Sequence, residues 1–373
     1  MSALRTFRIP VAITFVAVIA ATILGGPEVG LIVALLAVLE ISISFDNAIV
    51  NAHVLKSMTP KWQQIFLTWG ILIAVFGMRL VFPIVIVAAA SGLGIPDVLD
   101  QAINQQDLYA RNLEEANTTI AAFGGTFLLM VFLNFFFDAD KDHHWAGFIE
   151  RPLAAIGRID AAPTAIAGAV LLLVSQVVGE EYQHDVLVSG LAGLVIYLFV
   201  SGLADNLEPE DEDDAEADED EIARSQDTAE IAPSRADASR AAIGAAAKGG
   251  FATFMYLEVL DASFSFDGVI GAFAISKDIF VIAVGLGLGA IYIRTLTVYL
   301  VRQGTLSEYR YLEHGAHWAI GVLAALLFIG IEHHVPEVIT GCLGAGLIIA
   351  AFLSSLAANR RDAREAASAT PTT

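Results

Sequence analysis

The chain has 373 residues, of which 56% are hydrophobic and 16% charged, with a mean hydropathy of +0.66. Soluble domains carry about 25% charged residues, so this composition excludes an ordinary soluble protein. Much of the net charge of −21 comes from one acidic run, residues 208–221, and therefore says little about a substrate. The single cysteine, Cys342, excludes an internal disulfide and a cysteine-based zinc site.

Long apolar stretches predict an all-α fold, a polytopic bundle of transmembrane helices. A spanning helix needs roughly 17–25 apolar residues, and these stretches are too continuous for the alternating strands of a barrel. The first stretch follows Arg5 and Arg8, and we expect an uncleaved helix there instead of a signal peptide. We expect ten spans, at residues 9–25, 28–51, 65–91, 119–137, 163–180, 186–204, 249–273, 278–300, 314–331 and 335–357.

The placement of basic residues tests this number of spans. With a cytoplasmic N-terminus, 16 of the 20 Lys and Arg residues fall on the cytoplasmic side and only Arg111 and Lys277 fall outside. Arg79 and Arg294 lie within spans. Because cytoplasmic loops carry an excess of basic residues, we expect a protein of the cell (plasma) membrane with both termini in the cytoplasm.

The chain divides into four parts. Residues 1–204 form an N-terminal membrane half, and residues 249–357 form a C-terminal membrane half. Between them, residues 205–248 are acidic and then rich in Ala, Ser and Arg, which predicts a disordered cytoplasmic linker. Residues 358–373 are expected to be a cytoplasmic tail.

An internal repeat links the two halves. Residues 39–49 match residues 260–270 at six of eleven positions, and Glu40 corresponds to Asp261. Each copy is followed by a span with one arginine, Arg79 or Arg294. Five spans separate the copies, and this odd number predicts an inverted-topology repeat, as in many secondary transporters.

Five carboxylates lie at apparent membrane depth, although an acid there costs roughly 2.5–3.5 kcal/mol even on lenient scales. Carboxylate, hydroxyl and amide oxygens are ligands of hard divalent cations. Structural polar contacts between helices are the alternative, but five acids in a repeat favour a metal site. The candidate ligands are Glu40, Ser44, Asp46, Asn47, Glu258, Asp261, Ser265 and Asp267.

An ideal helix would not bring the acids of one copy together. Glu40 and Asp46 are six residues apart and would point about 120° apart. We therefore expect the helix to unwind near Ser44 and near Ser265, with Gly268 making the second break easier.

Several other polar residues are weaker candidates. Arg79 and Arg294 are either counter-ions of the acids or structural partners. His314 and His317 are either ligands or proton carriers, or simply interfacial residues at a helix end.

Two amides and one loop complete the candidates. Asn134 and Gln176 are candidate cavity-lining residues, and residues 138–144 form either a secondary metal patch or a solvated loop. No nucleotide-binding loop, nucleophile elbow or HExxH motif occurs, so an enzyme is not expected.

The repeat motif resembles the TerC-like integral membrane family, named for a tellurium-resistance protein. The similarity rests on residues 39–48, 261–271 and 311–321, and residues 135–150 look like a subgroup of unknown function. This family belongs with LysE-type cation exporters, and several members are implicated in manganese efflux. The resemblance implies that Glu40, Asp46, Asn47, Asp261 and Asp267 are ion-site residues.

The leading hypothesis is a secondary transporter that exports a divalent cation, above all manganese, in exchange for protons. Calcium and magnesium remain open, because their ligand preferences are close. The alternatives are a membrane scaffold or assembly factor in the response to metal or tellurite stress, and a membrane enzyme. We expect no cofactor and no nucleic-acid partner; the expected partners are the transported metal ion and the lipid bilayer.

Overall fold

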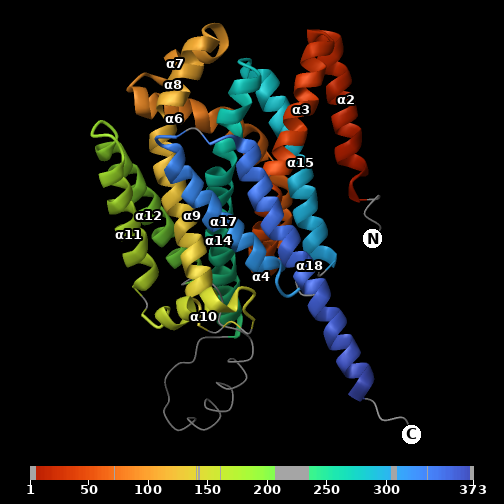
Figure 1. Cartoon of the computed structure of the whole chain (residues 1–373). Coiled ribbons are helices and arrows are strands. Elements are labelled where there is room, and N and C mark those ends of the chain that lie inside the picture. Colours follow the sequence, from red (N-terminus) through yellow and green to blue (C-terminus); the bar gives the residue numbers. More distant parts are fainter. Residues whose placement is uncertain are drawn as a thin grey trace.

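The computed structural model describes residues 6–70, 72–139, 141, 143–159, 161–205, 235–303, 309–333 and 335–369. Within these residues all regular structure is helical and no β-strand occurs. The helices stand side by side in one bundle (Figure 1). The predicted all-α class is therefore confirmed.

Six helices of the described chain are long and apolar enough to cross a bilayer, or up to eight spans exist if each of two bent pairs is one span. The six are α2 (Arg8–Gly25), α9 (Asn117–Phe137), α12 (Gln183–Asp205), α15 (Ile279–Gln303), α17 (Leu312–Gly330) and α18 (Glu337–Ala369). The first bent pair joins α3 (Pro27–Ile43) to α4 (Phe45–Ser57). The protein is therefore a multi-pass membrane protein.

The second bent pair contains an unusual helical form. It consists of α5 (Pro60–Ile65), η1 (Phe66–Gly70), η2 (Ile73–Val81) and α6 (Phe82–Ser91), and its two parts meet at 44°. Both η1 and η2 are π-helices, which are rare and often occur at functional sites. Arg79 lies in η2, so this form positions one of the two buried arginines.

Two further helices match predicted spans but differ from the eight candidates. α11 (Ala162–Val177) is apolar but has only 16 residues. α14 (Arg235–Ile275) has 41 residues and carries three acids of the predicted metal site, which lower its hydropathy.

Three short helices lie outside the predicted spans. α7 (Ile95–Asn104) and α8 (Gln106–Glu115) cap one end of the bundle, whereas α10 (Gly147–Ile156) lies across the other end (Figure 1). We call these the α7 end and the α10 end. The α2–α3 and α14–α15 turns both lie at the α7 end, so α3 and α14 run in opposite directions.

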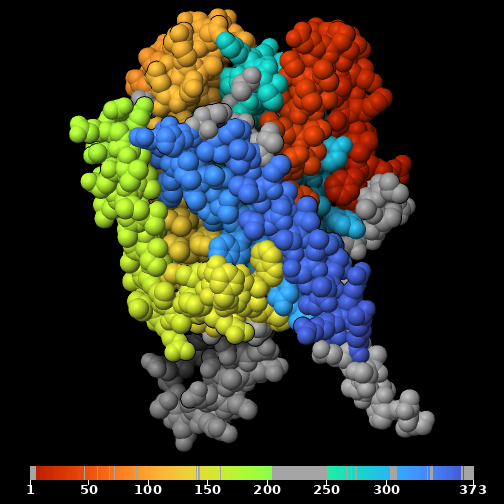
Figure 2. All heavy atoms as spheres, in the orientation of Figure 1, coloured from red at the N-terminus to blue at the C-terminus, as the bar shows by residue number. Residues whose placement is uncertain are grey.

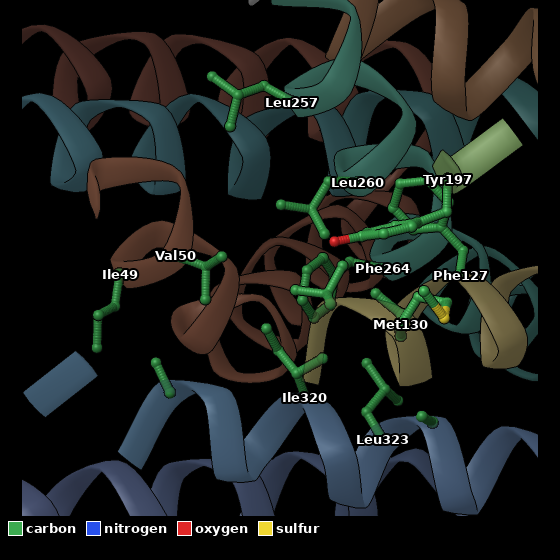
Figure 3. Packing of buried hydrophobic residues seen from close by; sticks show 14 of the residues in the cluster. Ile49, Val50, Phe127, Met130, Tyr197, Leu257, Leu260, Phe264, Ile320 and Leu323 are labelled. Atoms are coloured by element: carbon green, nitrogen blue, oxygen red, sulfur yellow. The ribbon is translucent and has the colours of Figure 1, made fainter. Parts of the chain in front are cut away.

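The main hydrophobic core joins α4, α9, α12, α14 and α17. Figure 3 shows Ile49, Phe127, Tyr197, Leu260 and Ile320 from these helices packed together. On α14 the core residues are spaced three and four apart, which is one face of a helix. Glu258 and Asp261 each follow one of these core residues by one position and face a neighbouring direction, so the core fixes where these two acids point.

Two boundaries differ from the predictions. α14 begins at Arg235, within the segment 205–248 for which disorder is expected, and α18 continues to Ala369 through the predicted tail. Both extensions are rich in alanine and arginine, which favour helix strongly. The acidic run at 208–221 lies outside the described residues.

Candidate functional site

The first copy of the repeat places a buried carboxylate beside a buried arginine. Glu40 lies in the last turn of α3 and is 2% exposed. Its Oε1 atom accepts hydrogen bonds from the Ser44 hydroxyl, at 2.9 Å, and from the Arg79 guanidinium. Arg79 also donates to the carbonyl of Ala74, five residues earlier in its own helix. The other oxygen of Glu40, Oε2, has no hydrogen-bond partner among the described residues.

The second copy holds two acids with one arginine. A nitrogen of Arg294 lies 2.8 Å from Asp261 Oδ2 and 3.4 Å from Glu258 Oε1. The guanidinium also lies 3.8 Å from the centre of the Phe66 ring, which is a favourable place for a buried cation. Gly70 makes room for this group, because a Cβ atom there would lie 2.9 Å from Glu258 Oε1.

The two copies contact each other directly. The side-chain amide of Asn47, in the first copy, donates to Asp261 of the second copy at 2.5 Å. Asn51, one turn further along α4, donates to the same oxygen at 3.4 Å. In the opposite sense, a Cβ atom on Gly268 of the second copy would lie 3.0 Å from the unpartnered oxygen of Glu40. The acidic segments of the two halves therefore meet at one place inside the bundle.

A small cavity lies at this meeting point. Its volume is about 10 Å³, enough for about one water molecule. The Ser265 hydroxyl lines it and, like Glu40 Oε2, has no partner among the described residues. Buried polar atoms almost always have a partner, so these oxygens indicate space for a bound water or cation. The lining residues are Glu40, Ser44, Asn47, Ala74, Arg79, Asp261, Ser265, Ala290, Ile293 and Arg294.

The described acids do not form a ready-made metal site. No three Asp, Glu, His or Cys side chains in the described chain are grouped as metal ligands. Arg79 and Arg294 instead neutralise two of the three charges of Glu40, Glu258 and Asp261. Internal ion pairs therefore close this arrangement, and a cation would have to compete with the arginines for these acids.

The two aspartates of the Ser-Phe-Asp motif cannot be placed in this geometry. Asp46 belongs to the first turn of α4, and Asp267 belongs to α14. The positions of both side chains lie outside the described part of the structure. Their assignment as ligands stays a prediction.

The predicted helix break is present in one copy and absent in the other. α3 ends at Ile43 and α4 begins at Phe45, with a bend of 57° around Ser44. The prediction of a second break near Ser265 is wrong, because α14 continues through that residue. Gly268 serves instead for the close approach to Glu40.

The two histidines lie in a separate polar cluster at the α10 end. His314 Nδ1 is 3.1 Å from a carboxylate oxygen of Glu150, and His317 Nδ1 is 3.0 Å from the carbonyl of Glu313. Neither histidine lines the cavity between the repeats. Both histidines therefore lie away from the acids of the repeats, and their role as ligands or proton carriers stays a prediction.

The prediction that Asn134 and Gln176 line the cavity is wrong. Asn134 donates to the Tyr197 hydroxyl at 2.7 Å and does not line the cavity, and Gln176 is exposed. The sequence reasoning missed Asn51, which is fully buried and contacts Asp261. Its position four residues after Asn47 was the available signal, because this spacing places both amides on one helical face.

The comparison with protein families gives one result. Residues 45–362 match the model of DUF475, which is described as a protein of unknown function. The chain belongs to the DUF475 family. No curated protein and no solved structure matches it. The family match covers the second repeat and most of the bundle, and it begins just after the break at Ser44.

Proposed function

We propose that this DUF475 protein is a secondary transporter that exports a divalent cation through the cavity between its two repeats. The observation that carries the proposal is the unpartnered oxygen of Glu40, which faces Gly268 beside the Asn47–Asp261 contact. A buried carboxylate oxygen without a donor is costly, and a bound cation would remove that cost.

The cation is a hard divalent ion, and manganese is the leading candidate. Glu40, Ser44, Asp261 and Ser265 offer only oxygen ligands, which suit manganese, calcium and magnesium better than copper or zinc. The preference for manganese rests on the resemblance of the repeat motif to the TerC-like family.

The proposed architecture has ten spans arranged as an inverted repeat. α11 and α14 would add two spans to the eight candidates, since α11 is apolar and α14 is buried within the bundle. The opposite directions of α3 and α14 support inverted copies (Figure 1). We place the protein in the plasma membrane, and the distribution of Lys and Arg favours an orientation with the α10 end and both termini in the cytoplasm.

Transport requires the arginines to give way to the cation. Arg79 and Arg294 hold the acids when no metal is present, so a cation would bind as these guanidinium groups withdraw. The bend at Ser44 supplies a hinge beside Glu40, and rocking of one repeat would open the cavity to each side in turn. Protons would then replace the metal on the acids at the outer side.

The test is metal flux in proteoliposomes. We expect a pH gradient to drive Mn²⁺ movement by the purified wild-type protein, and Glu40→Gln or Asp261→Asn to lower the rate at least tenfold. Glu28→Gln is the matched control, because Glu28 is an exposed acid on the same helix as Glu40. If Asp46→Asn and Asp267→Asn both leave the flux unchanged, the proposed site is wrong.

A scaffold or assembly factor is the rival function, and the ion pairs favour it. Each described acid at the site already contacts an arginine, as expected for a purely structural network. The scaffold predicts that Glu40→Gln lowers the unfolding temperature but leaves the manganese content of cells unchanged. Transport predicts that cellular manganese rises when the same variant replaces the wild type.

A further inference from the structure

The short helix α10 and the residues that follow it have an unusual distribution of polar and apolar side chains. Glu150 and Ala154 lie on the buried face, and Glu150 is only 1% exposed. The opposite face exposes Phe148 to 83%, Ile156 to 43% and Ile159 to 63%. At about 100° per residue, Phe148 and Ile156 lie about 80° apart on α10, and Ile159 follows three residues after the helix ends. A helix facing water normally has the reverse arrangement.

Glu150 fixes this orientation through contacts with the bundle. It accepts hydrogen bonds from the backbone amides of Trp145, at 2.9 Å, and Ala146, at 3.1 Å. It also accepts one from the Trp318 indole on α17 at 3.0 Å, and His314 Nδ1 lies 3.1 Å away.

These contacts also keep Glu150 charged. Burial alone would raise the pKa of Glu150, but the contacts with His314, Ala146 and Trp318 outweigh it and lower the pKa to about 2. Glu150 is therefore ionised at neutral pH, and α10 cannot rotate about its axis without breaking the contacts of this carboxylate.

The helix that follows α10 also exposes apolar side chains. α11 begins at Ala162, six residues after α10 ends, and it exposes Leu172, Leu173 and Val177 by 59–74% in its second half, the part farther from α10. Figure 2 shows the yellow-green atoms of α10 on the open surface at the α10 end, next to α11. The 16 residues of α11 are about 24 Å long, which is less than the roughly 30 Å thickness of a hydrocarbon core, so a bilayer that covers α11 would also reach the apolar face of α10.

The charges beside this face distinguish α10 from the comparable helix at the other end. The charged side chains exposed on residues 147–159 are Arg151, which lies beside the apolar sector of α10, and Arg158, two residues after the helix ends. α7 also exposes an apolar stripe, at Leu99 and Ile103, but its exposed charged residues are Asp97 and Asp100. Basic residues beside an apolar face suit anionic headgroups, whereas acidic residues do not.

We propose that α10 is an interfacial helix that embeds its apolar face in the leaflet at the α10 end and binds anionic lipid headgroups through Arg151 and Arg158. Glu150 joins this lipid-binding helix to α17 through His314 and Trp318. The inference does not depend on transport, because it rests only on the exposed faces and charges of α10.

The test measures the depth of α10 and its lipid preference in the full-length protein. A fluorophore is attached to Phe148→Cys in a Cys342→Ser background, and the protein is reconstituted in phosphatidylcholine with or without phosphatidylglycerol. We expect strong quenching by nitroxide lipids and weak quenching by aqueous iodide. Replacing Arg151 or Arg158 by Gln should lower the preference for nitroxide phosphatidylglycerol about fivefold each. A label at Leu99→Cys on α7 should be quenched by lipid without this preference.

Three results would overturn the proposal. Strong iodide quenching with no lipid quenching would place the face in water. Self-quenching between labels on different molecules would show that a second copy covers it. Equal quenching by both nitroxide lipids would show that α10 has no preference for anionic headgroups. Because Phe148 and Arg151 are exposed, the label and the Gln variants should leave folding intact, which the unfolding temperature checks.

Discussion

The two copies of the acidic motif share six of eleven residues but have different shapes. The first copy bends by 57° at Ser44, whereas the second copy is part of one straight helix through Ser265. Because both serines occupy the same motif position, the local sequence does not decide where the break occurs. The surroundings differ: α14, which carries the second copy, packs chiefly on α9, α12 and η2, whereas α3 and α4, which carry the first copy, pack chiefly on α15, α2 and α18. The comparison suggests a hinged half and a fixed half around one cavity.

The largest expected effect comes from the arginine that serves two acids. Arg294→Met leaves Glu258 and Asp261 buried without their cation, and should lower the free energy of unfolding by about 3–5 kcal/mol. Arg79→Met should cost less, because Glu40 keeps the Ser44 hydrogen bond. Thermal unfolding in detergent measures both. Equal losses would contradict the unequal roles of the two arginines.

Metal binding should stabilise the protein by an amount that depends on concentration. At a Mn²⁺ concentration about 100 times the dissociation constant, the gain is about 2.7 kcal/mol, and a chelator should reverse it. The gain should disappear in Glu40→Gln and remain in Glu28→Gln. A gain that persists in Glu40→Gln would place the metal outside the cavity.

Substitutions at the two glycines that face Glu40 should distinguish a loss of stability from a loss of Mn²⁺ binding. A Cβ atom on Gly289 would lie 2.4 Å from Glu40 Cβ, so Gly289→Ala should cost about 1–3 kcal/mol of stability. Gly268→Ala meets only the end of the Glu40 side chain, so it should cost less stability but weaken Mn²⁺ binding. Gly346→Ala, with open space around it, is the control. Unfolding temperature and Mn²⁺ titration give the two measurements.

The two serines should have unequal effects on stability, with the smallest expected effect at Ser265. Ser44→Ala removes a hydrogen bond to a charged group and should cost about 1.5–3 kcal/mol. Ser265→Ala removes a hydroxyl without a partner among the described residues, so stability should change by less than about 0.5 kcal/mol. Chemical unfolding compares them. A large cost for Ser265→Ala would reveal a partner that a bound water or ion supplies.

Much of the fold could be predicted because bilayer-spanning helices depend on long apolar stretches. The pairing of Glu40 with Arg79 and of Asp261 with Arg294 could be anticipated as counter-ions from their matching positions in the repeat. α10 could not, because a short helix with one buried acid lacks a long apolar stretch.

The site was harder to predict wherever tertiary contacts decide it. The sequence suggested that Gly268 would allow a helix break, but in the structure this glycine lets α14 approach the Glu40 side chain closely. His314 and His317 looked like site residues by their chemistry, yet the fold directs them to Glu150 and Glu313 at the α10 end. Side-chain chemistry alone does not reveal which end of a helix bundle a residue reaches. The proposed metal, the transport activity and the TerC-like resemblance stay predictions.

The π-helical form of η2 makes the position of Arg79 depend on the exact length of the chain. A π-helical turn accommodates about one residue more than an α-helical turn, and the Arg79 guanidinium donates to the carbonyl of Ala74 in the same helix. Deleting one residue between Ile73 and Gly77 would let the segment relax to an ordinary α-helix. The guanidinium would then swing by about 100° and lose Glu40, although no side chain of the ion pair had been altered.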